Sequence, residues 1–355
     1  MPASSLPHAL PVHPLQLEVQ EFDSYALIVD LRPAEAFAVD HIPRAISVPW
    51  RSGVAAAGGA VTGVESGVVV PAAVEPAQGL PYALEARLGS LDASSAVLLY
   101  CDRGGAVSAE VATGLAGRGL LADVLPGGWA SYRRWVDAGI EVLARALDWR
   151  WIRSAPGGAS QALVRALLAR GEQALDSSAL FDHILMPGLI AGPSQIEAPS
   201  FESRLVDVLR RFDPAVRVWA DEVIVLSGEQ ALPTPIDEAL RHAERWRVES
   251  PIDCRADLLA ATLHESGGSV ASLLDAIGPA KPGPFADALA DVRRQVDRVD
   301  ERELLATLLG VLDPLYGSLS VPDGGGRERS LRLASATPAA VDRLAAQLSR
   351  GQISP

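Results

Sequence analysis

Short apolar runs alternate with helix-periodic segments over residues 15–145 of the chain. Each apolar run ends at charged or turn-forming residues, which is the pattern of a buried strand. The predicted strands cover residues 25–32, 45–50, 95–101 and 122–128. Helices are predicted at residues 33–42, 82–91, 106–119 and 129–139. Strands that alternate with helices favour a parallel sheet covered on both faces. A stretch rich in Gly, Ala and Val, residues 51–80, is predicted to form a long loop.

The same alternation resumes near residue 149 and then becomes mostly helical. Strands are predicted at 149–155, 215–222 and 245–251, with a helix at 160–171. Further helices are predicted at 254–263, 270–277, 285–296 and 301–312. A turn-rich connector at 322–330 precedes a final short helix. We therefore expect an α/β protein with a parallel-sheet domain at 15–145 and a second α/β domain with a helical extension at 149–320. A C-terminal tail is expected at 321–355.

Composition narrows the class of protein. The chain has 355 residues, more than usually fold around a single hydrophobic core, and this length agrees with two domains. Its net charge of −13 repels nucleic acid on average but allows a local basic patch. Two cysteines do not make a disulfide framework, and a reducing cytoplasm is expected. The N-terminus does not read as a signal peptide, and charge or glycine interrupts every apolar run, so no membrane partner is expected.

Cys101 stands where a predicted strand ends and a helix begins, the usual place for a ligand crevice in an open α/β sheet. The backbone N–H groups of the next residues can form a nest for an anion, and that field favours a thiolate nucleophile. The residues assigned to this anion-stabilising loop are Asp102, Arg103, Gly104, Gly105, Ala106 and Val107. The alternative is a buried structural cysteine.

The segment "LIVDLRPAEAFAVDHIPRAISVP" resembles the start of a rhodanese domain. Its matching positions are Asp30, Arg32, Glu35, Phe37, His41, Ile42, Pro43, Ala45 and Pro49. Together with a cysteine at the mouth of a later strand, this resemblance covers roughly residues 15–145. It implies that Cys101 carries the chemistry and that His41 is structural.

Further segments resemble the tRNA 2-selenouridine synthase family, which fuses a rhodanese domain to a P-loop domain. The matching stretches are "CDRGGAVS" at 101–108, "GGWASYRRWV" at 127–136, "GPSQIEAPSFESRL" at 192–205 and "LDPLYGSL" at 312–319. They occur in the family's order. The resemblance implies that Cys101 carries selenium or sulfur to the wobble 2-thiouridine of tRNA.

The same resemblance implies several small molecules and partners. Selenophosphate and geranyl diphosphate would be co-substrates, the anticodon loop of tRNA would be bound, and a selenophosphate synthase is a possible partner. Two other functions stay open from the sequence. One is a non-catalytic tRNA- or protein-binding homologue that keeps the fold. The other is a simple thiosulfate-type sulfurtransferase that uses the first domain alone.

The sequence departs from that family at polar positions. The stretch Ser154–Gln161 aligns with the phosphate loop, but Ser160 replaces the lysine and Gln161 the hydroxyl that a P-loop needs. We therefore expect a degenerate P-loop, with Gly157, Gly158 and Ser160 as its phosphate-binding candidates. In the cysteine loop, Val107 replaces an arginine and Asp102 a phenylalanine of the family pattern. Both changes favour a divergent or partly inactive member.

Two acids follow the strand at 215–222, at the place of a Walker-B carboxylate. Asp221 and Glu222 are either Mg²⁺ ligands or a solvated strand end, and no metal site is predicted.

Arginines interleave with aromatic residues near the domain junction, as on surfaces that stack unpaired bases. The candidates for tRNA contact are Arg133, Arg134, Arg150, Trp151 and Arg153. The alternative is that the aromatics pack the junction while the arginines reach into water.

Overall fold

The chain folds into two compact units, and each unit is built from two separate stretches of the sequence. The computed structural model describes residues 21–50, 84, 87–89, 91–92, 94–102, 105–176, 180, 185–186, 189–190, 198–222, 232–277, 284–319 and 328–351. Unit 1 comprises Met1–Ile140 and Glu197–Arg211. Unit 2 comprises Glu141–Ile196 and Phe212–Pro355. One stretch from the second half of the chain therefore belongs to the first unit.

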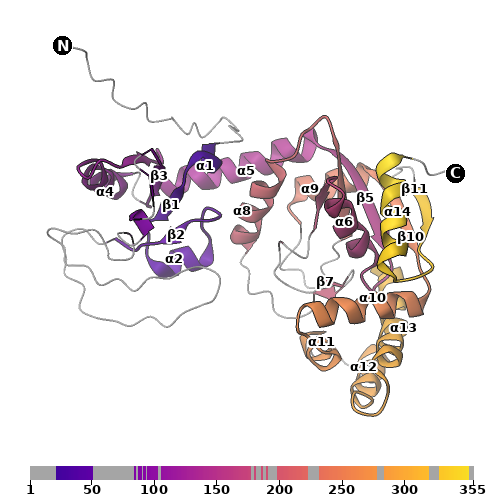
Figure 1. Cartoon of the computed structure of the whole chain (residues 1–355). Coiled ribbons are helices and arrows are strands. Elements are labelled where there is room, and N and C mark those ends of the chain that lie inside the picture. Colours follow the sequence, from indigo (N-terminus) through magenta and orange to yellow (C-terminus); the bar gives the residue numbers. More distant parts are fainter. Residues whose placement is uncertain are drawn as a thin grey trace. The chain divides into compact units, whose positions relative to one another are not determined.

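Unit 1 is built on a four-stranded parallel sheet (Figure 1). Its strands, in the order β2-β1-β3-β4, are β2 (Ile46–Ser47), β1 (Leu27–Asp30), β3 (Ala96–Tyr100) and β4 (Leu121–Val124). The inner strands β1 and β3 are almost wholly buried, which explains why both are unbroken apolar runs. The parallel sheet expected from the alternation is confirmed.

The helices of unit 1 are α1 (Glu21–Ser24), α2 (Ala34–Val39), α4 (Ala106–Ala116), α8 (Ala198–Leu209) and α5 (Gly128–Ala146), whose last six residues count with unit 2. Helix α8 follows the first strands of unit 2 in the sequence, yet it packs in unit 1 through buried Phe201, Leu205 and Leu209. A fragment ending near residue 147 would lack this helix.

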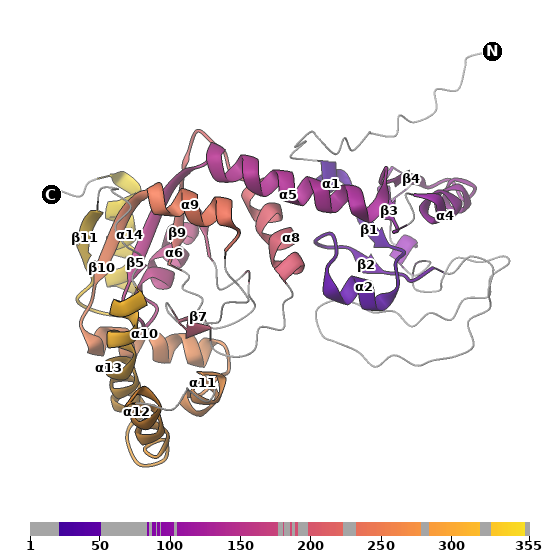
Figure 2. The same ribbon diagram turned by 180° about the vertical axis from the view of Figure 1, so that it is seen from behind.

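Unit 2 is built on a five-stranded parallel sheet (Figure 2). Its strands, in the order β11-β10-β5-β9-β6, are β11 (Glu328–Arg332), β10 (Glu244–Glu249), β5 (Asp148–Ser154), β9 (Arg217–Asp221) and β6 (Gln173–Leu175). The chain leaves central β5 toward β6 on one side and leaves β10 toward β11 on the other. Such a reversal between neighbouring strands marks where open α/β sheets bind ligands.

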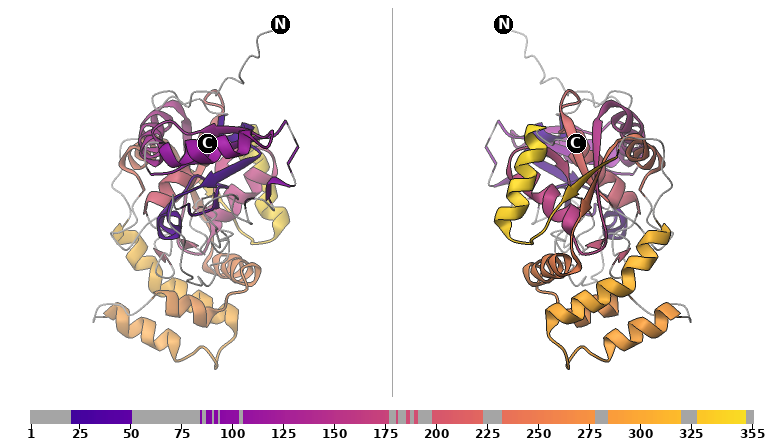
Figure 3. Two further views of the ribbon diagram at one scale, coloured as in Figure 1. Left: turned by 90° about the vertical axis from the view of Figure 1, so that its left-hand side faces the viewer. Right: turned by 90° about the vertical axis from the view of Figure 1, so that its right-hand side faces the viewer.

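Helices cover the second sheet and extend from it. The helices α6 (Ala159–Ala169) and α14 (Pro338–Arg350) share one apolar cluster with the strands, including Ile152, Trp219 and Trp246. Helix α9 (Thr234–His242) also contacts β5. A second apolar cluster joins α10 (Ile252–Glu265), α11 (Val270–Ile277), α12 (Pro284–Arg293) and α13 (Glu301–Leu319). These helices are the orange ribbons in Figure 3. The short strands β7 (Leu185–Met186) and β8 (Leu189–Ile190) pair antiparallel.

Several elements differ from the sequence pattern. Helix α5 runs to Ala146, past the predicted end at residue 139. Strand β11 occupies part of the predicted connector 322–330, and α14 packs in the core instead of a tail. Only Leu331 in β11 is buried, so the strand carries almost no apolar signal. The loop predicted at 51–80 lies outside the described residues.

No helix in the described ranges has the length and apolar character needed to span a bilayer.

Candidate functional site

Backbone hydrogen bonds fix Cys101 at the carboxyl end of β3. On one side, the Leu31 N–H donates to the carbonyl of Tyr100 (2.9 Å). On the other, the Trp129 N–H at the start of α5 donates to the Cys101 carbonyl (3.1 Å). The side chain is 3% exposed and belongs to an apolar cluster that includes Val48 and Val107. The cysteine is therefore held by the sheet and by two neighbouring elements.

The loop after Cys101 returns to helix α4 through a glycine that no other residue replaces easily. Gly105 has φ +94°, in the left-handed region, and a Cβ there would lie 3.3 Å from Cγ1 of Val124. Helix α4 begins at the next residue, Ala106. Asp102 is exposed and Val107 is buried, whereas Arg103 and Gly104 lie outside the described residues. The strand–loop–helix geometry expected from the sequence is present around Cys101.

A buried ion pair lies at the carboxyl end of β1, the strand beside β3. Arg32 Nε donates to both carboxylate oxygens of Asp30 (3.0 Å each), and its Nη2 donates to Oδ2 (2.7 Å). Both side chains are at most 3% exposed. Burial alone would lower the pKa of Arg32, but the hydrogen bonds and charge of Asp30 raise it. The pair is an internal structural element of unit 1.

Arg32 also connects this pair to the cysteine. Its guanidinium lies over the ring of Trp129, 3.6 Å from the centroid. Its Nη2 donates to the backbone carbonyl of Asp40 (2.5 Å). The Trp129 N–H in turn donates to the Cys101 carbonyl. The Arg32 side chain therefore contacts both Asp30, its partner in the ion pair, and Trp129, the residue that fixes the cysteine.

His41 has the contacts of a structural residue. Its ring stacks on Phe37 (4.0 Å between centroids, 11° between planes), and its Nδ1 lies 2.9 Å from the Phe37 carbonyl oxygen. Burial lowers the pKa of His41, which favours the neutral ring at pH 7. This agrees with the structural role that the rhodanese resemblance implies.

Arg133 is the centre of a polar cluster that ties α8 to unit 1. Its Nη1 donates to Asp40 Oδ2 (3.0 Å) and to the Pro199 carbonyl (3.0 Å), and its Nη2 binds the carboxylate of Glu202. Ser203 Oγ donates to the same Asp40 oxygen (3.1 Å). Burial raises the pKa of Asp40, while the Ser203 hydrogen bond and the Arg133 charge oppose that rise. Arg133 of the motif 127–136 thus contacts Pro199 and Glu202, which belong to the described part of the motif 192–205.

The five candidates for tRNA contact lie in different surroundings. Arg134, in unit 1, is exposed, and its Nη2 donates to Ser131 Oγ (2.9 Å). Arg150, in unit 2, pairs with Asp148 and Glu244. Trp151 and Arg153 are each 5% exposed, and Arg153 Nε donates to Glu222 (2.9 Å). With Arg133 engaged by α8, Arg134 is the candidate most open to water.

The acids at the end of β9 do not form a solvated strand end. Asp221 and Glu222 are each 2% exposed, and Glu222 forms an ion pair with Arg153. In the part of the chain that the structure describes, no three His, Cys, Asp or Glu side chains gather as metal ligands.

The phosphate-loop candidate has the expected backbone path, from β5 to α6, but its polar groups bind one another. Gly157 and Gly158 have φ +122° and +84°, in the left-handed region. The Ser160 N–H donates to Ser154 Oγ (3.1 Å), and that hydroxyl donates to Ser160 Oγ (3.1 Å). The amide and hydroxyl at the helix start are therefore satisfied within the chain.

An arginine from α10 covers the same loop. A Cβ on Gly157 would lie 2.6 Å from the Cβ of Arg255. Arg255 Nη1 donates to the Pro156 carbonyl (2.8 Å), and both terminal nitrogens bind Asp313 of α13 (2.7 and 2.8 Å). The triphosphate of a nucleotide, which a complete P-loop binds, does not fit these residues, because the lysine is absent and Arg255 packs against Gly157.

Mg²⁺–ATP is therefore expected to leave the thermal unfolding midpoint of the full chain unchanged. A ligand at one hundred times its Kd stabilises a protein by about 2.7 kcal/mol, which such a measurement resolves. Mg²⁺ alone is the control. A rise in midpoint that requires the nucleotide would show that the loop opens.

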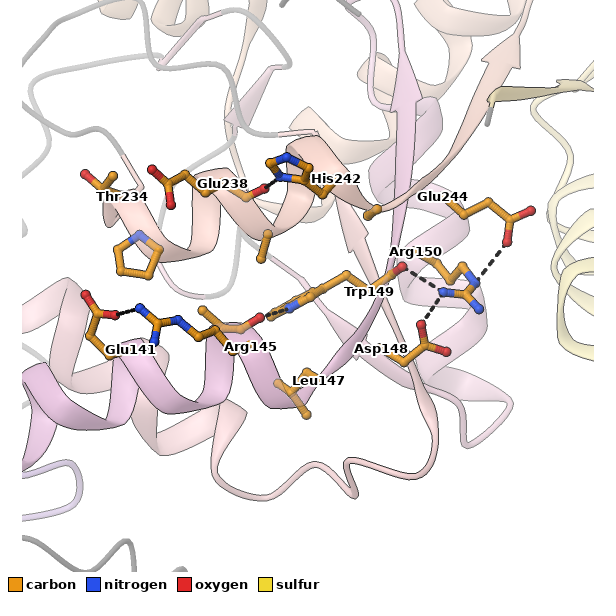
Figure 4. A pocket seen from close by; sticks show the side chains of 14 residues that line it. Glu141, Arg145, Leu147, Asp148, Trp149, Arg150, Thr234, Glu238, His242 and Glu244 are labelled. Atoms are coloured by element: carbon orange, nitrogen blue, oxygen red, sulfur yellow. Dashed lines mark hydrogen bonds and ion pairs between the residues drawn. The ribbon is translucent and has the colours of Figure 1, made fainter. Parts of the chain in front are cut away.

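A hollow of about 700 Å³ lies at the opposite end of the strands, where β5 begins (Figure 4). Five of its charged side chains bind one another: Glu141 pairs with Arg145 (2.8 Å), and Arg150 pairs with Asp148 and Glu244. Trp149 donates its ring N–H to the Ala144 carbonyl (3.0 Å). Of the residues assigned to a site from the sequence, it contains Arg150.

Comparison with known families gives one match. Residues 16–134 match the rhodanese-like domain, a range that includes Cys101, the buried ion pair and most of unit 1. No curated protein and no solved structure matches the chain. The chain thus contains a rhodanese-like domain, which suggests sulfurtransferase-type chemistry without identifying a substrate. The selenouridine synthase family and a P-loop domain stay predictions from the sequence.

Proposed function

We propose that the protein is a sulfur or selenium transferase in which Cys101 carries the transferred atom. The observation that supports this most directly is the position of Cys101 in the rhodanese-like domain. It ends an inner strand of the parallel sheet, and the glycine turn at Gly105 begins a helix directly afterwards. In this proposal, backbone N–H groups after the strand end stabilise an anion on the sulfur, as they do in strand–loop–helix nests.

The transfer on sulfur has two steps. The Cys101 thiolate attacks the outer sulfur of a donor such as thiosulfate, the donor S–S bond breaks, and sulfite leaves with the electron pair. An acceptor nucleophile then attacks the outer sulfur of the persulfide, and the Cys101 thiolate leaves. In this proposal the loop 102–107 and the start of α4 stabilise the negative charge on the thiolate and persulfide.

The tRNA substrate that we propose is 2-thiouridine, as the family resemblance implies, and its reaction is a displacement rather than the sulfur transfer above. Its sulfur attacks geranyl diphosphate and diphosphate leaves; a selenide nucleophile derived from selenophosphate, with release of phosphate, then attacks C2, and the geranylated sulfur leaves as the thiolate. The ordered set of motifs supports this substrate, and two pairs of motif residues and partners lie in contact: Arg133 with Glu202, and Asp313 with Arg255 beside the Gly157 loop. Selenophosphate and geranyl diphosphate would then be co-substrates. Within this proposal, Arg134 is the tRNA-contact candidate that the structure leaves exposed.

A second candidate is a homologue that keeps the fold without turnover. Val107, buried among the apolar residues around Cys101, supports it, because an arginine at this position would help to hold a dianionic donor. The exposed carboxylate of Asp102 next to the cysteine also opposes a thiolate.

Mass spectrometry of tRNA nucleosides from cells with and without the gene separates these functions. Loss of selenated, geranylated or thiolated uridine on deletion is the result expected of the transferase. Unchanged nucleosides together with a persulfide on Cys101 would instead indicate a sulfurtransferase with another acceptor. Unchanged nucleosides and no modified cysteine would overturn the proposal in favour of the non-catalytic homologue.

A further inference from the structure

We propose that helix α8 positions the cysteine site of unit 1, acting through Ser203, Asp40 and Arg32. The inference builds on the proposed function, because it concerns regulation of Cys101. It makes Ser203 and Arg133 positioning residues rather than catalytic ones, since neither touches the reacting sulfur in the contacts described above.

The first link joins α8 to the segment after α2. Asp40 is 2% exposed, and one of its carboxylate oxygens accepts hydrogen bonds from Ser203 Oγ (3.1 Å) and Arg133 Nη1 (3.0 Å). Arg133 is itself held by Glu202 and by the Pro199 carbonyl, both at the start of α8. The placement of Asp40 therefore depends on α8 being docked.

The second link joins Asp40 to the cysteine. The Asp40 backbone carbonyl accepts a hydrogen bond from Arg32 Nη2 (2.5 Å), and the Arg32 guanidinium lies on the Trp129 ring (3.6 Å). The Trp129 N–H donates to the Cys101 carbonyl (3.1 Å). Each step is a direct contact, and Asp40, Arg32 and Cys101 are at most 3% exposed.

Burial makes such a series of contacts sensitive to the loss of one member. Polar groups in a low-dielectric interior bind strongly, and an unpaired one is costly, so the neighbours shift to restore their hydrogen bonds. If Asp40 loses Ser203, Arg133 is the remaining donor to that carboxylate oxygen, so we expect the Asp40 carbonyl to shift and Arg32 to carry Trp129 with it. The backbone at Cys101 is the end point of that movement.

The position of α8 in the sequence gives this link a regulatory meaning. The chain on both sides of Glu197–Arg211 belongs to unit 2, although these residues pack in unit 1. A ligand or partner that changes unit 2 can therefore act on α8 through the chain itself. Cys101 would then be fully positioned only while α8 is docked.

The test compares two variants of the full-length protein. Ser203→Ala removes the bond from α8 to Asp40. Arg211→Ala is the matched control, because Arg211 lies just after α8 and holds it through Asp23 (2.8 Å) and Asp207 (3.3 Å), away from Asp40. The measurements are the rate at which iodoacetamide alkylates Cys101 across a pH series, the rate of persulfide formation from thiosulfate, and the melting temperature.

Ser203→Ala is expected to change the alkylation rate of Cys101 by roughly 3- to 30-fold and to displace its pH profile. Arg211→Ala should stay within about two-fold of the parent, as for an exposed ion pair. A third variant, Asp40→Asn, keeps an acceptor for Ser203 and Arg133 and should change the rate less than Ser203→Ala.

Equal rates in Ser203→Ala and the parent, at temperatures where both are folded, would overturn the inference. So would equal changes in Ser203→Ala and Arg211→Ala, which would indicate general loosening of α8. The two readouts keep the proposals apart. If thiosulfate forms no persulfide on the parent, the proposed sulfur transfer from that donor fails, while alkylation of Cys101 still tests the role of α8.

Discussion

Replacement of Cys101 by serine is expected to abolish persulfide formation on the protein while leaving the fold in place. A hydroxyl has no sulfur to extend and is a far weaker nucleophile at neutral pH. Cys101 is 3% exposed among apolar side chains, so the buried hydroxyl costs about 1–3 kcal/mol. Most domains retain their fold after a loss of this size. Intact-protein mass spectrometry after incubation with thiosulfate measures the result.

The other cysteine is the matched control for this experiment. Cys254 is 4% exposed in the apolar cluster of unit 2, and burial, together with the charge of Asp257, raises the pKa of its thiol. A thiol in this state reacts slowly. Cys254→Ser should therefore keep the full persulfide signal. Two results would contradict Cys101 as the sulfur carrier. One is persulfide formation on the Cys101→Ser variant, and the other is loss of the persulfide in the Cys254→Ser variant alone.

Replacement of Arg32 by alanine is expected to lower the free energy of unfolding by about 3–5 kcal/mol, because it leaves the buried carboxylate of Asp30 without its partner. The Asp40 carbonyl and the face of Trp129 lose contacts at the same time. Denaturant unfolding of the full chain, followed by a probe of unit 1, measures the change.

Arg44→Ala is the control for the loss of one arginine in the same unit. Arg44 also pairs with an aspartate, Asp23 (2.9 Å), but its side chain is 50% exposed, and such a pair contributes about 0–1 kcal/mol. A similar small effect for Arg32→Ala would mean that water reaches Asp30, and the buried ion pair would then not be a structural requirement of unit 1.

The local pattern was sufficient to predict the sheet of unit 1 and the place of its cysteine. Strands β1 and β3 are buried on both faces, so each is an unbroken apolar run ending in Asp30 and Cys101. The two glycines after Cys101 predicted the tight return to a helix, and one of them, Gly105, has the left-handed conformation. These features depend on neighbours in the sequence.

Other elements gave little local signal. Edge strand β11 buries a single leucine, and α8 forms in a segment for which the sequence pattern predicts no helix. The interleaved arginines and aromatics left two interpretations open, a surface that contacts tRNA or a packed domain junction, and Trp151 and Arg153 are buried within the sheet of unit 2. The spacing of apolar residues indicates which side chains are buried only when one face of the helix or strand is exposed to solvent.

The sequence by itself determined the fold class, the rhodanese-like domain and Cys101 as the candidate nucleophile, because each rests on residues close together in the chain. The tertiary structure decided which distant residues serve them. It brought Ser203 to Asp40 across 163 positions and Arg255 to Asp313 across 58. Such partners are chosen by packing and by the cost of leaving a buried charge unpaired, and neither is written in a local pattern.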